Sequence, residues 1–271
     1  MEFLKNRFLR VFFKIKKNID ATEWDMSDVF LVSYPKSGVT FLSLVLANIL
    51  SSKDNVKRRI DFFNVHDYIP DIHSNPQRIK YLDPPRIIKT HEDFNEWHKR
   101  IKIKGHDIIF PRVIYLIRDG KDAMASYYDY FCNLTGKDIR FNDFLKWKTK
   151  KRVNWDIHVK GWILNNNVID SREILIIRYE DLLSNEIHEV KKIMDFLGIR
   201  VSEAIIEDSI EKSSLRTIGK FEAKFGGGTR YKNSQYTFAR KGEKRVYDKD
   251  LKEKIRQYYN NNIKTFNELG Y

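Results

Sequence analysis

The sequence predicts an α/β fold in which helices flank a doubly wound parallel sheet, within a single domain. From residue 29 onward, short and nearly all-apolar segments alternate with segments of helical pattern. Such an apolar segment is typical of a parallel strand buried on both faces, and strands that alternate with helices favour a doubly wound sheet. No internal repeat and no Pro- or Ser-rich linker divides the 271 residues, which favours one domain.

Four strands and five helices are predicted along the chain. The strands are expected at 29–33, 86–89, 113–117 and 173–178. The helices are expected at 40–50, 120–131, 154–164, 186–197 and 249–269. Residues 51–85 are polar and contain Pro70, Pro76, Pro84 and Pro85, which predicts a long irregular excursion over the surface.

Two basic segments stand apart from this pattern. Residues 1–24 are predicted to be a basic amphipathic segment before a domain at 25–271, because 1–20 hold six cations and two anions around an apolar helical face. This face fits either packing on the domain or peripheral contact with a membrane surface. Residues 219–245 contain three consecutive glycines, eight cations and two acids, which predicts either a mobile lid or an ordinary loop.

The charge and cysteine content restrict the partners and the compartment. Lys and Arg outnumber Asp and Glu by 50 to 37, and the net charge of +13 predicts an anionic partner. A nucleotide, a nucleic acid, an acidic glycan and a membrane surface all meet that description. Cys132 is the single cysteine and cannot form an internal disulfide, and no run is apolar enough to span a membrane. The sequence therefore predicts a cytoplasmic protein without a transmembrane segment.

A strand-to-helix turn at 34–40, Tyr-Pro-Lys-Ser-Gly-Val-Thr, is the first candidate site. Backbone N–H groups and the helix dipole converge on an anion at such a turn. Lys36 adds a positive charge, and Gly38 allows a ligand to approach the backbone closely. The segment lacks the Lys-[ST] end of a Walker A loop, whose hydroxyl binds Mg²⁺. It therefore predicts a phosphate-binding loop that needs no metal.

The chain resembles the sulfotransferases that use 3′-phosphoadenosine 5′-phosphosulfate (PAPS). The motifs that carry the resemblance occur in the family's order: the turn at 34–40, Pro-Pro-Arg-Ile-Ile-Lys-Thr-His at 84–91, the segment 112–128, Trp155 with His158 and Trp162, Arg-Tyr-Glu-Asp-Leu at 178–182, and Arg-Lys-Gly at 240–242. The resemblance extends from about residue 29 to the C-terminus. It implies a P-loop-like α/β fold, PAPS as the donor and no metal.

The resemblance implies three catalytic residues. His91 would act as the general base, since a neutral imidazole can take a proton from an acceptor hydroxyl or amine. Lys36 would stabilise the leaving group, and Lys89 would assist by contacting the sulfuryl oxygens or the acceptor. Among the seven histidines, the motif alone distinguishes His91.

The resemblance also implies a donor site. Its first part would surround the phosphosulfate, while Arg118 and Ser126 would bind the 3′-phosphate and Tyr179 the adenine. The residues implied are Lys36, Ser37, Gly38, Val39, Thr40, Phe41, Arg118, Ser126, Tyr179, Ser213, Leu215, Arg240, Lys241 and Gly242. The residues alone also allow Arg118 to pair with Asp119 or Asp122.

This chain departs from the family at several donor positions. The usual Thr-Thr-Trp is Val39-Thr40-Phe41 here, so one phosphate hydroxyl is lost while an aromatic face remains. Leu215 replaces an aromatic residue that normally flanks the base. The family's C-terminal dimer motif is not recognisable, which leaves the oligomeric state open.

The predicted reaction is sulfuryl transfer from PAPS to a hydroxyl or amine of a small-molecule acceptor, with no nucleic acid as partner. One alternative is a glycan- or protein-directed sulfotransferase. A second is a P-loop kinase that uses ATP and Mg²⁺. A third is a nucleic-acid-binding protein, suggested by the net charge and by the basic stretch at 146–152. The segments that would bind the acceptor are those least like the family, so the sequence does not identify the acceptor.

Overall fold

The computed structural model describes residues 25, 27–54, 58–73, 76–101, 112–135, 139–149, 153–164, 173–225 and 249–260. The predicted N-terminal segment at 1–24 lies outside these residues. Of the predicted lid, residues 219–225 form the end of helix α10 (Leu215–Phe225), and 226–245 lie outside the described residues.

A parallel sheet forms the centre of the fold. Its strands within the described residues are β1 (Val29–Ser33), β2 (Ile87–Thr90), β3 (Arg112–Ile117) and β4 (Ile174–Arg178), in the order β2-β1-β3-β4. Neighbouring strands are parallel throughout, with Val29 opposite both Ile87 and Arg112. The predicted fold class is confirmed, and each predicted strand agrees with the observed one to within one residue.

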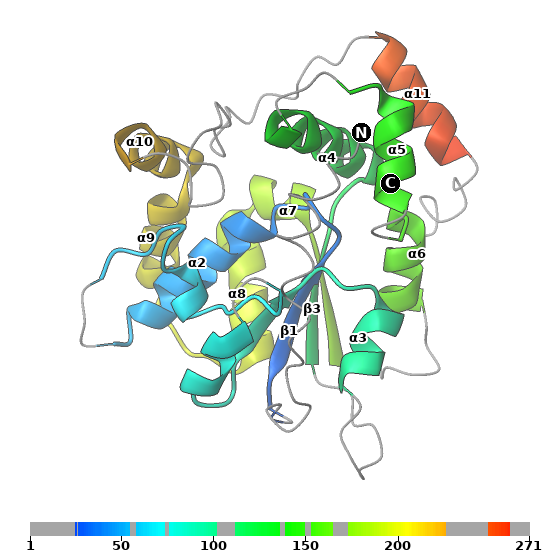
Figure 1. Ribbon diagram of the computed structural model, residues 1–271. Coiled ribbons are helices and arrows are strands. Elements are labelled where there is room, and N and C mark those ends of the chain that lie inside the picture. Colours follow the sequence, from blue (N-terminus) through cyan, green and yellow to red (C-terminus); the bar gives the residue numbers. More distant parts are fainter. Residues whose placement is uncertain are drawn as a thin grey trace.

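Helices cover both faces of the sheet (Figure 1). Leu31 faces one apolar cluster, whereas Phe30 and Val32 face the other, as the two-residue period of a strand requires. The helices that build the first cluster are α2 (Val39–Ser51), α7 (Tyr179–Ser184), α8 (Glu186–Leu197), α9 (Glu203–Ser213) and α10. Those that build the second are α3 (Phe94–Ile101), α4 (Gly120–Thr135), α5 (Phe141–Thr149), α6 (Trp155–Val159) and α11 (Lys249–Asn260).

The predicted helices at 40–50, 120–131 and 186–197 are confirmed as α2, α4 and α8. The pattern at 154–164 instead divides into α6 and a π-helical turn, Lys160–Leu164. Five helices were not predicted: α3, α5, α7 (Tyr179–Ser184), α9 and α10. None of the described helices is long and apolar enough to cross a membrane.

The excursion at 51–85 is more than a surface loop. It contains two 3₁₀ turns, η2 (Val65–Asp67) and η3 (Pro76–Tyr81), and it buries Ile69 and Ile79 completely. Its middle also adds to the sheet, because the Lys89 N–H donates to the Pro70 carbonyl at 2.8 Å. The prediction of an excursion confined to the surface was therefore wrong. Residues 70–72 pair with β2, the edge strand of the sheet, on the side away from β1.

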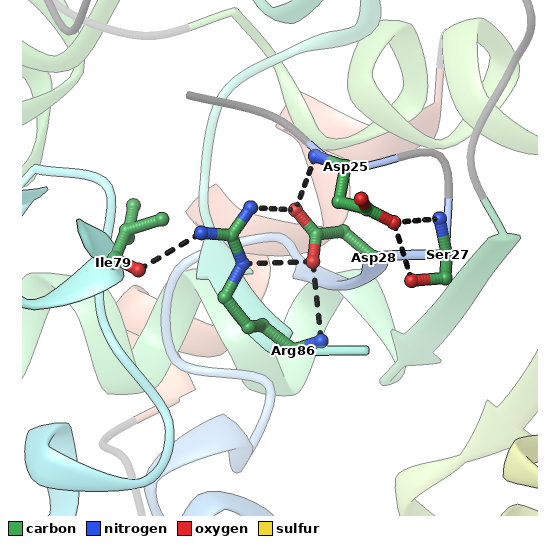
Figure 2. A network of polar contacts seen from close by, with 5 residues as sticks. All are labelled: Asp25, Ser27, Asp28, Ile79 and Arg86. Atoms are coloured by element: carbon green, nitrogen blue, oxygen red, sulfur yellow. Dashed lines mark hydrogen bonds and ion pairs between the residues drawn. The ribbon is translucent and has the colours of Figure 1, made fainter. Parts of the chain in front are cut away.

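A buried ion pair joins the start of β1 to the start of β2 (Figure 2). Arg86 donates from Nε and Nη2 to the two carboxylate oxygens of Asp28, at 2.8 and 2.6 Å. The same guanidinium donates from Nη1 to the Ile79 carbonyl at 2.9 Å, while the Asp25 N–H donates to Asp28. Both charged side chains are buried. The pair thus fixes the amino ends of two strands whose carboxyl ends carry the candidate site.

A fully buried lysine links α11 to the loop after β1. Lys148 in α5 donates from Nζ to Asn154 Oδ1 at 2.9 Å and to the Tyr258 hydroxyl at 3.3 Å. Its ammonium also lies 5.7 Å from the centre of the Tyr34 ring. Burial lowers the pKa of Lys148 to about 8, although the nearby Asp156 carboxylate opposes this shift.

We expect Lys148 to make the free energy of unfolding rise with pH above about pH 8. Between that pH and the ordinary pKa of 10.5, the unfolded chain keeps a proton on this lysine that the folded chain has lost. Folding in this pH range therefore releases a proton from Lys148. Raising the pH favours the state that binds fewer protons, so it stabilises the folded state, by on the order of 2 kcal/mol. Urea unfolding at pH values on either side of the shifted pKa measures the rise. It should be absent from Lys148→Met, and an equal rise in both proteins would contradict the assignment.

Candidate active site

The candidate site lies where the winding of the sheet reverses. The chain passes from β1 to β2 on one side and from β2 back across to β3 on the other, so the loops after β1 and β3 diverge at the middle of the sheet. Ligands of open α/β sheets bind at this point, outside the carboxyl ends of the strands. The two loops are joined directly, because Arg118 Nη1 donates a hydrogen bond of 3.0 Å to the Lys36 carbonyl.

The turn from β1 to α2 places two residues in the left-handed backbone region. Lys36 has a φ of 73° and Gly38, the N-cap of α2, has a φ of 92°. No side chain of the described residues caps this helix end, and its first turn contains no acidic residue. The first backbone N–H groups of α2, which have no partner within the helix, are therefore available to an anion at the positive end of the helix dipole.

Both the positive φ at position 38 and the neighbouring Tyr179 ring favour glycine there. A Cβ at this position would lie 2.4 Å from Cδ2 and Cε2 of Tyr179, the first residue of α7. The Arg118 guanidinium lies 4.6 Å from the centre of the same ring, within the range of a cation–π contact. The structure thus brings together three residues that the sequence predicted to bind the donor, which follow the carboxyl ends of β1, β3 and β4.

Two buried polar atoms at this point have no hydrogen-bond partner within the described part of the chain. They are the hydroxyl of Ser37, a fully buried residue, and Nε of Arg118. Buried polar atoms that no protein group satisfies are uncommon and call for a partner such as water or an ion. With the uncapped helix and the charge of Lys36, these atoms fit a phosphate or sulfate group.

Helix α4 contacts the turn after β1. The Lys36 ammonium lies 4.7 Å from the centre of the Tyr130 ring in this helix. Ser126, which is half-buried, precedes Tyr130 by four residues and so shares its helical face. Asp122 lies on this face one turn earlier, 4.0 Å from Nη2 of Arg118. Because this contact is long, Arg118 is not fully engaged by its carboxylate neighbour.

His91 follows β2 directly, and its hydrogen bond defines its tautomer. The Nδ1 atom lies 2.7 Å from the backbone carbonyl of Ser33 at the end of β1. A carbonyl oxygen can only accept, so Nδ1 carries the hydrogen and donates it. In the neutral ring Nε2 then holds the lone pair, which is the arrangement that a general base needs.

Lys89 is held by an ion pair that the sequence did not reveal. Its Nζ lies 2.9 Å from Oδ2 of Asp71, and both side chains are largely buried. Burial alone would raise the pKa of Asp71, but the positive charges of Lys89, His91 and His66 together hold it well below its usual value. Asp71 is therefore a carboxylate at the edge of the site.

The other predicted donor residues that the structure describes lie in helices α2, α9 and α10. Val39, the first residue of α2, is buried in the core, while Thr40 and Phe41 on the same helix are half-buried. The Ser213 hydroxyl donates to the Ser209 carbonyl and accepts from Asn48 of α2, so helix packing already engages it.

Leu215 begins α10 and is exposed. The predicted Arg240, Lys241 and Gly242 lie outside the described residues. Among the described residues, no three His, Cys, Asp or Glu side chains are grouped so as to hold a metal ion.

The chain is similar in sequence to known proteins over most of its length. Residues 26–268 match the family model described as Sulfotransferase domain. Sulfotransferase 1E1 of Bos taurus is 28% identical over 214 residues, which cover 73% of this chain and 68% of the relative. Sulfotransferase 1C2 of Homo sapiens is 26% identical over 212 residues, covering 73% of this chain and 67% of the relative.

Solved structures agree with this assignment. Mouse sulfotransferase SULT7A1, crystallised with PAP, aligns with a TM-score of 0.53 at 25% identity, over 72% of this chain and just under two thirds (66%) of that chain. Retinol dehydratase in complex with retinol and PAP shares the fold, with a TM-score of 0.64 at 18% identity over 94% of this chain and 86% of that one. Because the family model matches most of its length, the chain belongs to the family of PAPS-dependent sulfotransferases.

Proposed function

We propose that this sulfotransferase transfers the sulfuryl group of PAPS to a hydroxyl or amine of a small-molecule acceptor, with His91 as the general base. The observation that carries the proposal is the hydrogen bond from His91 Nδ1 to the Ser33 carbonyl. It directs the basic Nε2 lone pair away from β1, at the carboxyl end of the sheet where the anion-binding turn also lies. PAPS, when bound, supplies the sulfuryl group and the bisphosphate leaving group.

Lys36 acts on the charge that develops during transfer. Negative charge on the donor is spread over several oxygens, so the chain contributes mainly through position and electrostatics. The left-handed backbone of Lys36 and the hydrogen bond from Arg118 to its carbonyl fix where this side chain leaves the turn. The uncapped N–H groups of α2 and the Ser37 hydroxyl bind the same anion. Lys89 assists from β2, beside His91.

Arg118 and Ser126 are proposed to bind the 3′-phosphate, with Arg240, Lys241 and Gly242 contributing from the lid. The mouse structure that resembles this chain is a complex with PAP, the 3′-phosphorylated nucleotide, which supports this donor. Arg118 Nε lacks a partner among the described residues, and Ser126 lies on the helical face that borders the turn.

We expect calorimetry to show that adenosine 3′,5′-bisphosphate binds more tightly than AMP. Each charge-assisted contact to the 3′-phosphate should contribute about 1.5–3 kcal/mol, so the preference should exceed about tenfold. Ser126→Ala should weaken binding of the bisphosphate and leave AMP unaffected, whereas Arg118→Met should weaken both because it also releases the Lys36 carbonyl. Equal affinity of the wild-type protein for the two nucleotides would contradict the proposed donor site.

A further inference from the structure

Asp71 is placed beside the proposed base by the backbone as well as by its side chain. It forms a parallel bridge to Lys89, in which the Lys89 N–H donates to the Pro70 carbonyl at 2.8 Å and the Ile72 N–H donates to the Lys89 carbonyl at 3.0 Å. Bridged residues of adjacent strands project to the same face, and so do residues two apart on one strand. Asp71, Lys89 and His91 therefore share one face of the sheet.

The carboxylate is tightly held on this face. Oδ2 accepts from Lys89 Nζ at 2.9 Å, and Oδ1 accepts from the His73 N–H at 2.8 Å. The other titratable groups around it are His91, and His66 on η2, both of which attract its negative charge. Beyond these, the His73 ring lies 3.8 Å from the buried Glu92 carboxylate.

We propose that Asp71 is a positioning residue that sets the basicity of His91 and the place of Lys89. This proposal rests on the proposed function, in which Nε2 of His91 takes a proton from the acceptor and becomes positively charged. The Lys89 ammonium near by disfavours that second positive charge. The carboxylate neutralises the lysine and attracts the imidazolium, so His91 keeps enough basicity to accept the proton.

The proposal predicts opposite effects for two substitutions. In Asp71→Asn, the Lys89 charge is left unpaired beside His91, so the titration midpoint of His91 should fall by about one pH unit. In Lys89→Met, the repelling charge is gone and the midpoint should rise. The double variant Asp71→Asn/Lys89→Met should lie between them. Asp67→Asn, on the same excursion but paired with Arg58 and Arg78, should leave it unchanged.

Two measurements test this. NMR titration of the His91 ring, assigned by comparison with His91→Gln, gives the midpoint without turnover, and PAP binding verifies that each variant is folded. The acid limb of kcat/KM against pH should move in the same direction as the NMR midpoint. An unchanged midpoint in Asp71→Asn, or a uniform loss of rate at every pH, would overturn the proposal. Failure of the wild-type protein to use PAPS would instead overturn the proposed function, since the NMR titration does not depend on it.

Discussion

Replacing His91 by alanine should lower turnover by about 10²–10⁴-fold while leaving donor binding nearly intact. In the proposed site the donor is held by the turn after β1 and by Arg118, whereas the His91 ring is oriented by the Ser33 carbonyl, so removing the ring leaves the donor-binding groups in place. A positioned base contributes only to the step in which the acceptor loses its proton. Steady-state rates with a neutral alcohol acceptor, together with calorimetric binding of PAP, measure the two effects separately.

An acceptor that is already ionised provides the sharpest control. An acidic phenol at high pH needs no base, so it should partly rescue His91→Ala. Lys36→Met should behave differently, because in the proposed site its charge meets the donor both before and during transfer: binding and rate should both fall, without rescue. Methionine keeps most of the side-chain length without the charge and makes the same demand on the left-handed backbone. Full activity of His91→Ala with a neutral alcohol would exclude His91 as the base.

Replacing Arg86 by methionine should lower the free energy of unfolding by about 3–5 kcal/mol. The change leaves the Asp28 carboxylate buried without its bidentate partner, and desolvation of an unpaired charge is costly. Urea unfolding measures the loss. The double variant Asp28→Leu/Arg86→Met should recover much of it, because no charge then remains unpaired in the interior.

An exposed Arg–Asp pair with the same Nε–oxygen distance serves as the control for this experiment. Arg140 Nε donates to Asp143 at 2.8 Å, the distance found between Arg86 Nε and Asp28, but the Arg140 side chain is 87% exposed. Exposed pairs contribute about 0–1 kcal/mol, so Arg140→Met should change stability little. If both single variants lost the same stability, burial would not be the cause of the Arg86 effect.

The sheet was predictable because its strands read as short, largely apolar segments: β1 and β3 are buried almost throughout, and β4 is apolar although Ile176 is exposed. Helices such as α7 and α9 were not, since short segments with mixed faces resemble loops until tertiary packing selects one face. The turn after β1 was predicted together with its partners Arg118 and Tyr179, because an ordered set of motifs identified them. Asp71 was missed for a different reason: nothing local indicates that residues 70–72 pair with β2, since this pairing depends on how the excursion folds back.

Position 33 has a consequence for how the site tolerates change over evolution. The Nδ1 atom of His91 lies 2.7 Å from the backbone carbonyl of this residue, which every amino acid possesses, and 3.3 Å from the Ser33 hydroxyl, which mutation can remove. A small residue such as alanine at position 33 that keeps β1 and β2 in their register, with Val32 opposite Thr90, therefore keeps the shorter contact and with it the hydrogen on Nδ1. The orientation of the imidazole thus depends chiefly on strand pairing, and the Ser33 hydroxyl adds a second contact that a drifting sequence can lose while the first remains.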